Sequence, residues 1–310
     1  MNQFSRPSIP LPEAFVDDLR VGHLLGTIDA LDTAAAVIVG FPSDAGVTLN
    51  GGRAGAAGGP AALRDWLYRL TPDAVETSRF KELLKRTVDL GDVSVTDDLE
   101  LDQEALGELV APILKDGAVP IILGGGHETA FGHFLGHVYG GQSVSVLNWD
   151  AHPDVRPLKD GRPHSGSPFR QMMLHVSGSC STYTVAGLLP HQVSRTHVDW
   201  IFDRGGLVKW RSDLSESVVS ELYRSLEHPT MVSFDLDAVD QAFAPGVSAP
   251  ATGGLNVDMW LHAAYEAGRS PAVSSMDIVE LNPRLDVDER TARLAALTVW
   301  TFLRGLSARQ

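Results

Sequence analysis

Residues that commonly bind metal ions gather where apolar segments of this sequence end. In "LNWDAHPDVR" (147–156), an aspartate, a histidine and a second aspartate occupy alternate positions directly after an apolar stretch. A histidine stands in "GGGHE" after another apolar run, and two aspartates stand in "SFDLD" after a third. The complete set comprises His127, Asp150, His152, Asp154, Asp235 and Asp237.

Four carboxylates and two imidazoles are too many ligands for a single zinc ion, which prefers four. They suit a pair of divalent ions about 3.5–4 Å apart that share bridging carboxylates. Because oxygen donors outnumber nitrogen donors, manganese is favoured over copper or zinc. Each residue taken alone could instead cap a turn or fill the core, but the whole set at three successive strand ends favours a metal site.

The segments that carry these residues alternate between strand and helix patterns. The short runs rich in β-branched residues show little alternation of apolar and polar positions. A sheet with one face in water would need that alternation, so the runs predict strands covered on both faces. These predicted strands are residues 35–41, 86–92, 119–125, 143–150, 182–188, 198–203, 230–237 and 272–278. Helical patterns cover residues 59–70, 102–117, 215–227, 256–268 and about 288–306.

This alternation predicts an α/β fold, a single doubly wound domain with a mostly parallel sheet flanked by helices. No linker, repeat or low-complexity segment divides the chain. In such sheets, ligands bind outside the carboxyl ends of the strands, which is where the acid-rich segments fall. Side chains at alternate positions of an extended segment point to one side. We therefore expect the aspartates and histidines to converge at that edge.

Composition excludes several classes of protein. Of the 310 residues, 39 are acidic and 25 basic, and the formal charge of −14 argues against a nucleic-acid partner. No apolar run approaches the roughly 20 residues that span a bilayer, and the N-terminus lacks a signal-peptide pattern. Cys180 is the sole cysteine, and its neighbours in "SGSCST" offer no base that would make it a nucleophile. We expect a cytoplasmic enzyme that acts on a small molecule.

Three of the segments resemble the metal-binding signatures of the ureohydrolases, the arginase and agmatinase family. They are "GGGHE", "DAHPD" and "SFDLDAVDQAFAPGVSAP", and residues 40–64 and "MDIVELNP" (276–283) are similar too. The resemblance runs from about residue 36 to the C-terminus. It implies the arginase fold with an eight-stranded parallel sheet, two Mn²⁺ per chain and a homo-oligomer. Residues 1–310 would form a single arginase-like catalytic domain, with residues 1–35 as an N-terminal extension.

The resemblance also assigns the ligands to the two ions. His127 and Asp154 would bind one ion, and His152 and Asp237 would bind the other. Asp150 and Asp235 would bridge the pair.

Two departures distinguish a branch within this family. Arginases and agmatinases usually have Gly-Gly-Asp-His-Ser where this chain has "GGGHE", and they keep a histidine at the position of Ser165. Both differences, together with Arg156, resemble the formimidoylglutamases of histidine degradation. His164 departs from the usual loop of that branch, and on an extended strand it would face away from Ser165. Other ureohydrolases, which act on a guanidino acid or amine, and an inactive metal-binding homologue stay as alternatives.

The resemblance implies hydrolysis of N-formimino-L-glutamate to L-glutamate and formamide. A hydroxide between two divalent ions would attack the amidine-like carbon. Glu280 would hold the cationic nitrogen, and Asp154 would pass a proton to the leaving amine while it stays a ligand.

The two carboxylates of this substrate need cations from the protein. Arg156 is the first candidate, because it lies two residues after Asp154 and would share its side of an extended segment. Asn50, Arg53 and Arg170 are weaker candidates, and Ser165 completes the predicted substrate contacts.

Overall fold

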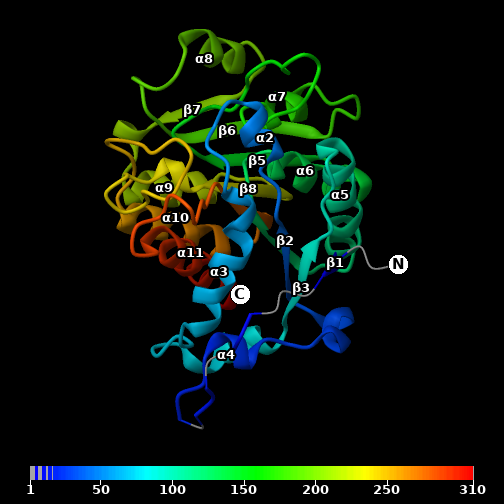
Figure 1. The fold of residues 1–310 in the computed structure, drawn as a ribbon, viewed down its shortest axis with the longest axis vertical. Helices are drawn as coiled ribbons and strands as arrows, with labels where there is room; N and C mark the ends of the chain where they lie inside the picture. The colour runs from blue at the N-terminus through cyan, green and yellow to red at the C-terminus, as the bar shows by residue number, and fades with distance from the viewer. Residues whose placement is uncertain (1–3, 6–8, 12, 16, 310) are drawn as a thin grey trace.

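The computed structural model describes residues 4–5, 9–11, 13–15 and 17–309. Within these residues the strands form one sheet in the order β1-β3-β2-β4-β9-β8-β5-β6-β7 (Figure 1). Eight strands run parallel, and the two-residue β1 pairs antiparallel with β3. The bounds are β1 Phe4–Ser5, β2 Ala36–Phe41, β3 Thr87–Val93, β4 Val119–Gly124, β5 Val144–Trp149, β6 Cys180–Leu188, β7 Leu207–Trp210, β8 Thr230–Asp235 and β9 Val273–Val279. The expected parallel eight-stranded sheet is confirmed.

Helices cover both faces of the sheet, and this explains the continuous apolar runs of the central strands. Every residue of β2, β4 and β8 is buried, as expected for a parallel sheet with no wet face. In Figure 1, α3, α9, α10 and α11 lie on one side of the sheet, and α5 and α6 lie on the other. The principal helices are α3 Gly59–Arg69, α4 Thr77–Lys85, α5 Leu99–Lys115, α6 Thr129–Tyr139, α7 Pro168–Met173, α8 Arg195–Phe202, α9 Glu216–Arg224, α10 Val257–Arg269 and α11 Arg290–Ser307.

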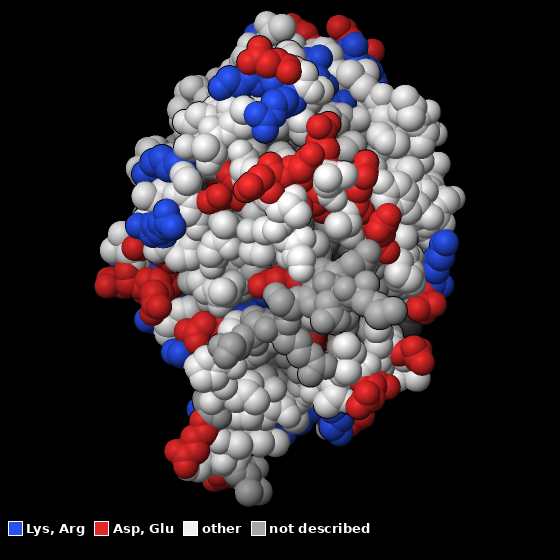
Figure 2. Space-filling view, turned by 45° about the vertical axis from the view of Figure 1, so that its right-hand side comes forward, with Lys and Arg blue, Asp and Glu red and all other residues white. Residues whose placement is uncertain are grey.

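Two further short helices, α1 Val21–Leu24 and α2 Ala45–Leu49, precede α3. None of the helices in the described ranges is both long enough and apolar enough to cross a membrane. On the face that Figure 2 shows, Asp and Glu side chains form a band across the surface, and Lys and Arg lie in smaller separate groups. The excess of acidic residues in the sequence is therefore visible at this surface.

One predicted strand is wrong. Residues 198–202 belong to helix α8, Asp203 is its C-cap residue, and the strand at this edge of the sheet is β7, four residues long. The run "VDWIF" is short and apolar, and such runs do not distinguish a strand from a helix. Val198 and Ile201 are the buried residues of α8, and their spacing of three places them on one helical face.

The parallel arrangement sets the position of the site. β4, β9, β8 and β5 are consecutive neighbours in the sheet, so their carboxyl ends meet along one stretch of its edge. The predicted metal ligands lie in the loops after β4, β5 and β8, except Asp235, which is the last residue of β8. The last strand, β9, lies between β4 and β8 and ends just before Glu280.

Candidate metal centre and active site

The structure brings the six predicted ligands together at the carboxyl ends of β4, β5 and β8. His127 lies at the centre of one group: its Nδ1 is 2.9 Å from Asp235 Oδ2 and 3.1 Å from Asp154 Oδ2. Asp150 Oδ2 lies 3.4 Å from the same nitrogen. In this group of four side chains, one ligand atom from each lies within 4.8 Å of the others.

A second group contains His152, Asp237 and again Asp150. His152 Nδ1 is 3.1 Å from Asp237 Oδ2 and 3.6 Å from Asp150 Oδ1. Asp150 thus faces both groups, one with each oxygen, as a bridging carboxylate would. Asp235 belongs to the His127 group alone, so its bridging role stays a prediction.

Two buried atoms of this cluster make no well-aligned hydrogen bond, although one of them lies close to three carboxylates. They are Nδ1 of His127 and Oδ1 of Asp237, both within the described part of the chain. A buried polar atom without a partner is costly, and such exceptions in folded proteins call for an ion, a water or a strained site. Both atoms are metal-ligand types, and oxygen donors dominate around them. The residues therefore fit divalent cations of the manganese class.

The carboxylates and imidazoles of the cluster shift one another's pKa values. The pKa of His127 lies well above 6.5, because the Asp235, Asp150 and Asp154 carboxylates outweigh the opposing effect of burial. Asp237 raises the pKa of His152 to about 12. Burial, with the nearby Asp237 and Asp150, raises the pKa of Asp235 well above its usual range. Metal binding requires neutral imidazoles and ionised carboxylates, so cations would displace these protons.

The loop after β5 does not continue as the extended segment that the sequence suggested. Residues 151 and 152 form a bend, and Asp154 has a left-handed φ of 43°. The bend is held by the His152 N–H, which donates to Asp150 Oδ1 at 2.6 Å, and by Tyr183 Oη, which donates to the Pro153 carbonyl at 2.7 Å. The three side chains converge because the backbone turns, and not because strand geometry alternates them.

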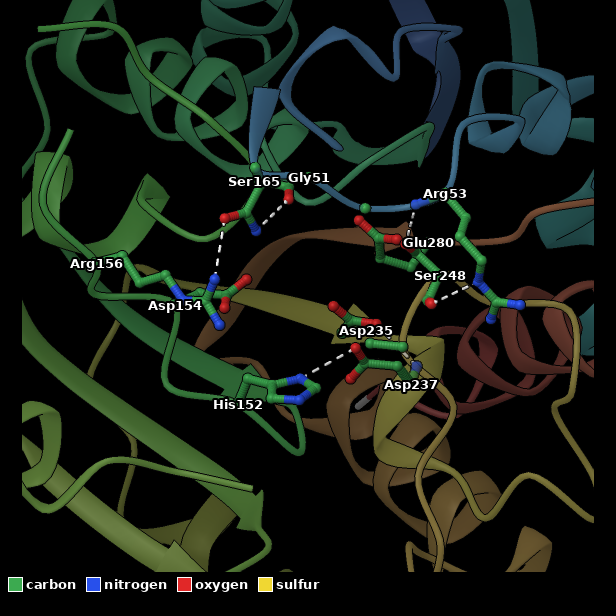
Figure 3. A pocket seen from close by; sticks show the side chains of 13 residues that line it. Gly51, Arg53, His152, Asp154, Arg156, Ser165, Asp235, Asp237, Ser248 and Glu280 are labelled. Atoms are coloured by element: carbon green, nitrogen blue, oxygen red, sulfur yellow. Dashed lines mark hydrogen bonds and ion pairs between the residues drawn. The ribbon is translucent and has the colours of Figure 1, made fainter. Parts of the chain in front are cut away.

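The cluster forms the floor of a pocket of about 380 Å³. Figure 3 shows His152, Asp154, Asp235 and Asp237 at its base, with Glu280 beside them. The remaining lining residues are Asn50, Gly51, Gly52, Arg53, Arg156, Ser165, Ser248 and Ala249.

Glu280 is buried and has a left-handed φ of 68°. Its own N–H donates to the Gly125 carbonyl at 2.7 Å, and its Oε1 accepts from the His127 N–H at 2.9 Å. Burial, with Glu128 and Asp237 nearby, raises the pKa of Glu280 well above 4.5. A cation in the pocket would oppose this shift, because it favours the ionised form of Glu280 and is stabilised by it.

One wall of the pocket is built by Arg156, Asn50 and Ser165. Arg156 Nη1 donates to Asn50 Oδ1 at 3.0 Å, and Asn50 Nδ2 donates to Ser165 Oγ at 3.0 Å. His164 is not among the residues that line the pocket, and the chain beside it forms a turn at residues 165–166 where an extended strand was expected. His164 Nε2 lies 3.0 Å from the Pro157 carbonyl oxygen, and its Nδ1 accepts from the Gly166 N–H.

The two weaker arginine candidates are engaged elsewhere. Arg53 reaches the pocket, but its Nε and Nη2 donate to the Ser248 and Val247 carbonyls at 3.0 and 2.8 Å. Arg170 is not among the lining residues; its Nε donates to the Val155 carbonyl, and its guanidinium lies 4.2 Å from the ring centroid of Trp200. Arg53 and Arg170 therefore support loops around the pocket in this structure.

Sequence reasoning missed two residues of the site. Ser248 lines the pocket, and its Oγ accepts from the Arg53 N–H at 2.8 Å. Glu128 is fully buried, and its Oε1 accepts from the Gly46 N–H at 2.7 Å, which ties α2 to the loop after β4. Burial raises the pKa of Glu128 to about 7. The glutamate in "GGGHE" was a usable signal, because a charged residue inside a glycine-rich turn after a buried strand needs a partner.

Comparison with known proteins agrees with this geometry. The family model described as the arginase family matches residues 34–304. The chain belongs to the arginase family. Among members of that family, a formimidoylglutamase of Rhodococcus opacus is 39% identical over 285 residues, which cover 86% of this chain and 85% of the relative. A formimidoylglutamase of Chromobacterium violaceum is 34% identical and covers 87% of each chain.

A solved arginase-family structure is also similar. The formiminoglutamase of Trypanosoma cruzi with two Mn²⁺ superimposes with a TM-score of 0.88 at 33% identity. The match covers 95% of this chain and all of that one.

Proposed function

We propose that this arginase-family protein is a formimidoylglutamase, which hydrolyses N-formimino-L-glutamate to L-glutamate and formamide in histidine degradation. The observation that carries the proposal is the pair of ligand groups sharing Asp150 at the base of a pocket walled by Arg156. The proposal is supported by the formimidoylglutamase relatives, which match over most of their length.

Two Mn²⁺ ions would be held by the two ligand groups. The first group offers His127, Asp150, Asp154 and Asp235, and the second offers Asp150, His152 and Asp237. When bound, such a pair of ions lowers the pKa of a water molecule and supplies hydroxide near neutral pH. The manganese in the similar T. cruzi structure supports this choice of metal.

The protein side chains would orient the substrate over that floor. Glu280 is held by the His127 N–H, so its carboxyl group is fixed where a formiminium nitrogen can meet it. Asp154 lines the pocket and can transfer a proton to the leaving amine. Arg156 can bind a substrate carboxylate with its remaining donors, because Asn50 accepts from Nη1. Ser165 presents a small hydroxyl where a larger imidazole would narrow the pocket.

A substrate panel tests the proposal. The protein is loaded with Mn²⁺ and assayed with formiminoglutamate, arginine, agmatine and guanidinobutyrate, measuring glutamate plus formamide against urea. We expect turnover of formiminoglutamate to exceed that of each guanidino compound by orders of magnitude. Equal or faster urea release would assign the protein to another ureohydrolase class. No turnover at full metal loading would identify an inactive homologue.

Other expectations of the sequence remain predictions. These are the cytoplasmic location, the homo-oligomer, and the division of the chain into one catalytic domain with residues 1–35 as an extension. Gel filtration with light scattering would determine the oligomeric state.

A further inference from the structure

A buried chain of hydrogen bonds runs from His127 into the interior, away from the pocket. His127 Nε2 lies 3.0 Å from Ser233 Oγ, and Ser233 Oγ donates to Asp277 Oδ1. Asp277 Oδ2 lies 2.7 Å from His133 Nδ1. Beyond it, Ser275 Oγ lies 2.6 Å from His133 Nε2 and 2.9 Å from His137 Nε2. The residues come from β8, β9 and α6, and every one of these side chains is buried.

The chemistry of these groups fixes the direction of the hydrogen bonds near the metal cluster. An ionised carboxylate only accepts, so Asp277 must receive a hydrogen from Ser233 and another from His133. The Ser233 hydroxyl has a single hydrogen, which it gives to Asp277, and it can therefore only accept from His127 Nε2. A neutral His127 thus carries its proton on Nε2. Its Nδ1 lone pair is left free, and Nδ1 is the buried nitrogen that makes no well-aligned hydrogen bond and faces three aspartates.

The far arm of the chain fixes the ring of His133. Burial and the nearby His133 lower the pKa of His137 to about 3, so His137 is neutral at physiological pH. The single hydrogen of a neutral His137 lies on Nδ1, which is 3.2 Å from Gln142 Oε1, an atom that only accepts, so His137 Nε2 accepts from Ser275 Oγ. Ser275 Oγ then accepts from His133 Nε2, and Asp277 Oδ2 accepts from His133 Nδ1.

We propose that Asp277 and His133 are positioning residues that, through Ser233, fix the tautomer and ring orientation of His127 and thereby the affinity for the ion bound at His127. The inference rests on the proposed metal centre. Metal-bound histidines usually donate their second N–H to a carboxylate or carbonyl, and loss of that partner typically weakens metal binding about 10- to 100-fold. Here the Ser233 hydroxyl lies between His127 and the Asp277 carboxylate and bonds both. His133, which lies outside the metal centre, orients that carboxylate.

Mn²⁺ affinity, measured by the EPR signal of free Mn²⁺ during titration, tests this role. Asp277→Asn keeps the shape of the side chain but removes its charge, and we expect one of the two ions to bind roughly 10- to 100-fold more weakly. The second ion, at His152 and Asp237, should be affected by less than about threefold, because it does not contact His127. The visible spectrum of the Co²⁺-loaded variant should change as well, which a loss of stability alone would not cause.

Two variants at His133 keep the test decisive if Asp277→Asn fails to fold. His133→Asn places an amide near Nδ1 and retains a donor to Asp277, whereas His133→Gln places it near Nε2 and loses that donor. We expect His133→Asn to bind both ions within about threefold of the wild type, and His133→Gln to weaken one ion about tenfold. His262→Gln is a control outside the network, since the half-buried His262 bonds Ser220 on α9.

The outcomes separate this inference from the proposed function. If the wild type binds fewer than two Mn²⁺ ions per chain, the metal centre itself is wrong. If the wild type binds two but His133→Gln and His133→Asn have equal affinities, the network only stabilises the fold and the inference is overturned. Unchanged affinities in a folded Asp277→Asn variant would overturn it too.

Discussion

Arg156 and Asn50 are joined at the pocket wall by a hydrogen bond of 3.0 Å from Nη1 to Oδ1. Asn50 follows α2 and Arg156 follows β5, so the bond connects segments far apart in the sequence. Asn50 also donates to Ser165. Asn50 orients the guanidinium and accepts from Nη1 only. The other N–H groups of Arg156 can therefore donate to a ligand carboxylate.

Replacement of Arg156 by methionine should therefore impair substrate recognition. Loss of one partner of a charge-assisted pair costs at least about 2 kcal/mol, so kcat/KM for formiminoglutamate should fall roughly 30-fold or more. Elemental analysis should find the metal content unchanged. Arg195→Met, which removes an exposed arginine paired with Asp199 on α8, is the matched control. Wild-type kcat/KM in Arg156→Met would show that the substrate carboxylates bind elsewhere.

Asn50 should act on substrate binding more than on turnover. Asn50→Ala removes the bonds to Arg156 and Ser165, each of which contributes about 1 kcal/mol, so KM should rise by up to roughly 30-fold. Asn50→Asp should raise KM at least as much, because its charge would compete with the substrate for Arg156. In both variants kcat should change less than about threefold, since Asn50 is placed to orient Arg156 and not the reacting atoms. A fall in kcat at constant KM would contradict this role.

The metal centre should hold two ions. Elemental analysis of the Mn²⁺-loaded protein should give about two per chain, as the shared Asp150 implies. Asp235→Ala should lose activity while circular dichroism shows an intact fold, and Asp199→Ala on the surface should keep both ions. Removal of the metal with a chelator should lower the melting temperature, because ions that bind only the folded state stabilise it. One ion per chain with full activity would contradict the binuclear centre.

Cys180 should be inert at neutral pH. Burial raises the pKa of its thiol to about 12, so the reactive thiolate is scarce in the folded protein. At pH 8 its alkylation by iodoacetamide should be on the order of a thousand-fold slower than in the urea-unfolded protein, where a thiol titrates near 8.5. The rate for the folded protein should rise tenfold with each pH unit, since the thiolate fraction does so below the pKa. Similar rates in the two states would contradict this burial, and Cys180→Ser should retain full activity.

The clustering of the candidate metal ligands could be predicted from the sequence because strand ends of a parallel sheet share one edge. Polar residues after buried strands therefore identify the site before its geometry is known. The loop conformation could not be predicted in this way. The left-handed φ of Asp154 depends on contacts with Tyr183 in β6 and on the His152 N–H, which no local pattern encodes.

The interior network was also beyond sequence reasoning, although traces of it are present. His133 and His137 lie four residues apart in the otherwise largely apolar α6, and Ser233 and Asp277 interrupt apolar strands. These polar residues could satisfy each other only if α6 packs against β9 and β8 lies beside β9. That packing depends on a strand order that the chain sequence does not reveal. The error at residues 198–203 arose similarly, because a short apolar run can be buried as either a helix or a strand.

The position of β9 determines when during synthesis the protein can acquire its ions. β9 is the last strand to leave the ribosome, yet it inserts between β4 and β8 and pairs with both. Until residues 273–279 are made, β4 and β8 lack the strand that holds them in register. His127 after β4 and Asp235 at the end of β8 are then not held close together. Such long-range pairing closes late. A nascent or truncated chain without β9 would therefore not bind Mn²⁺.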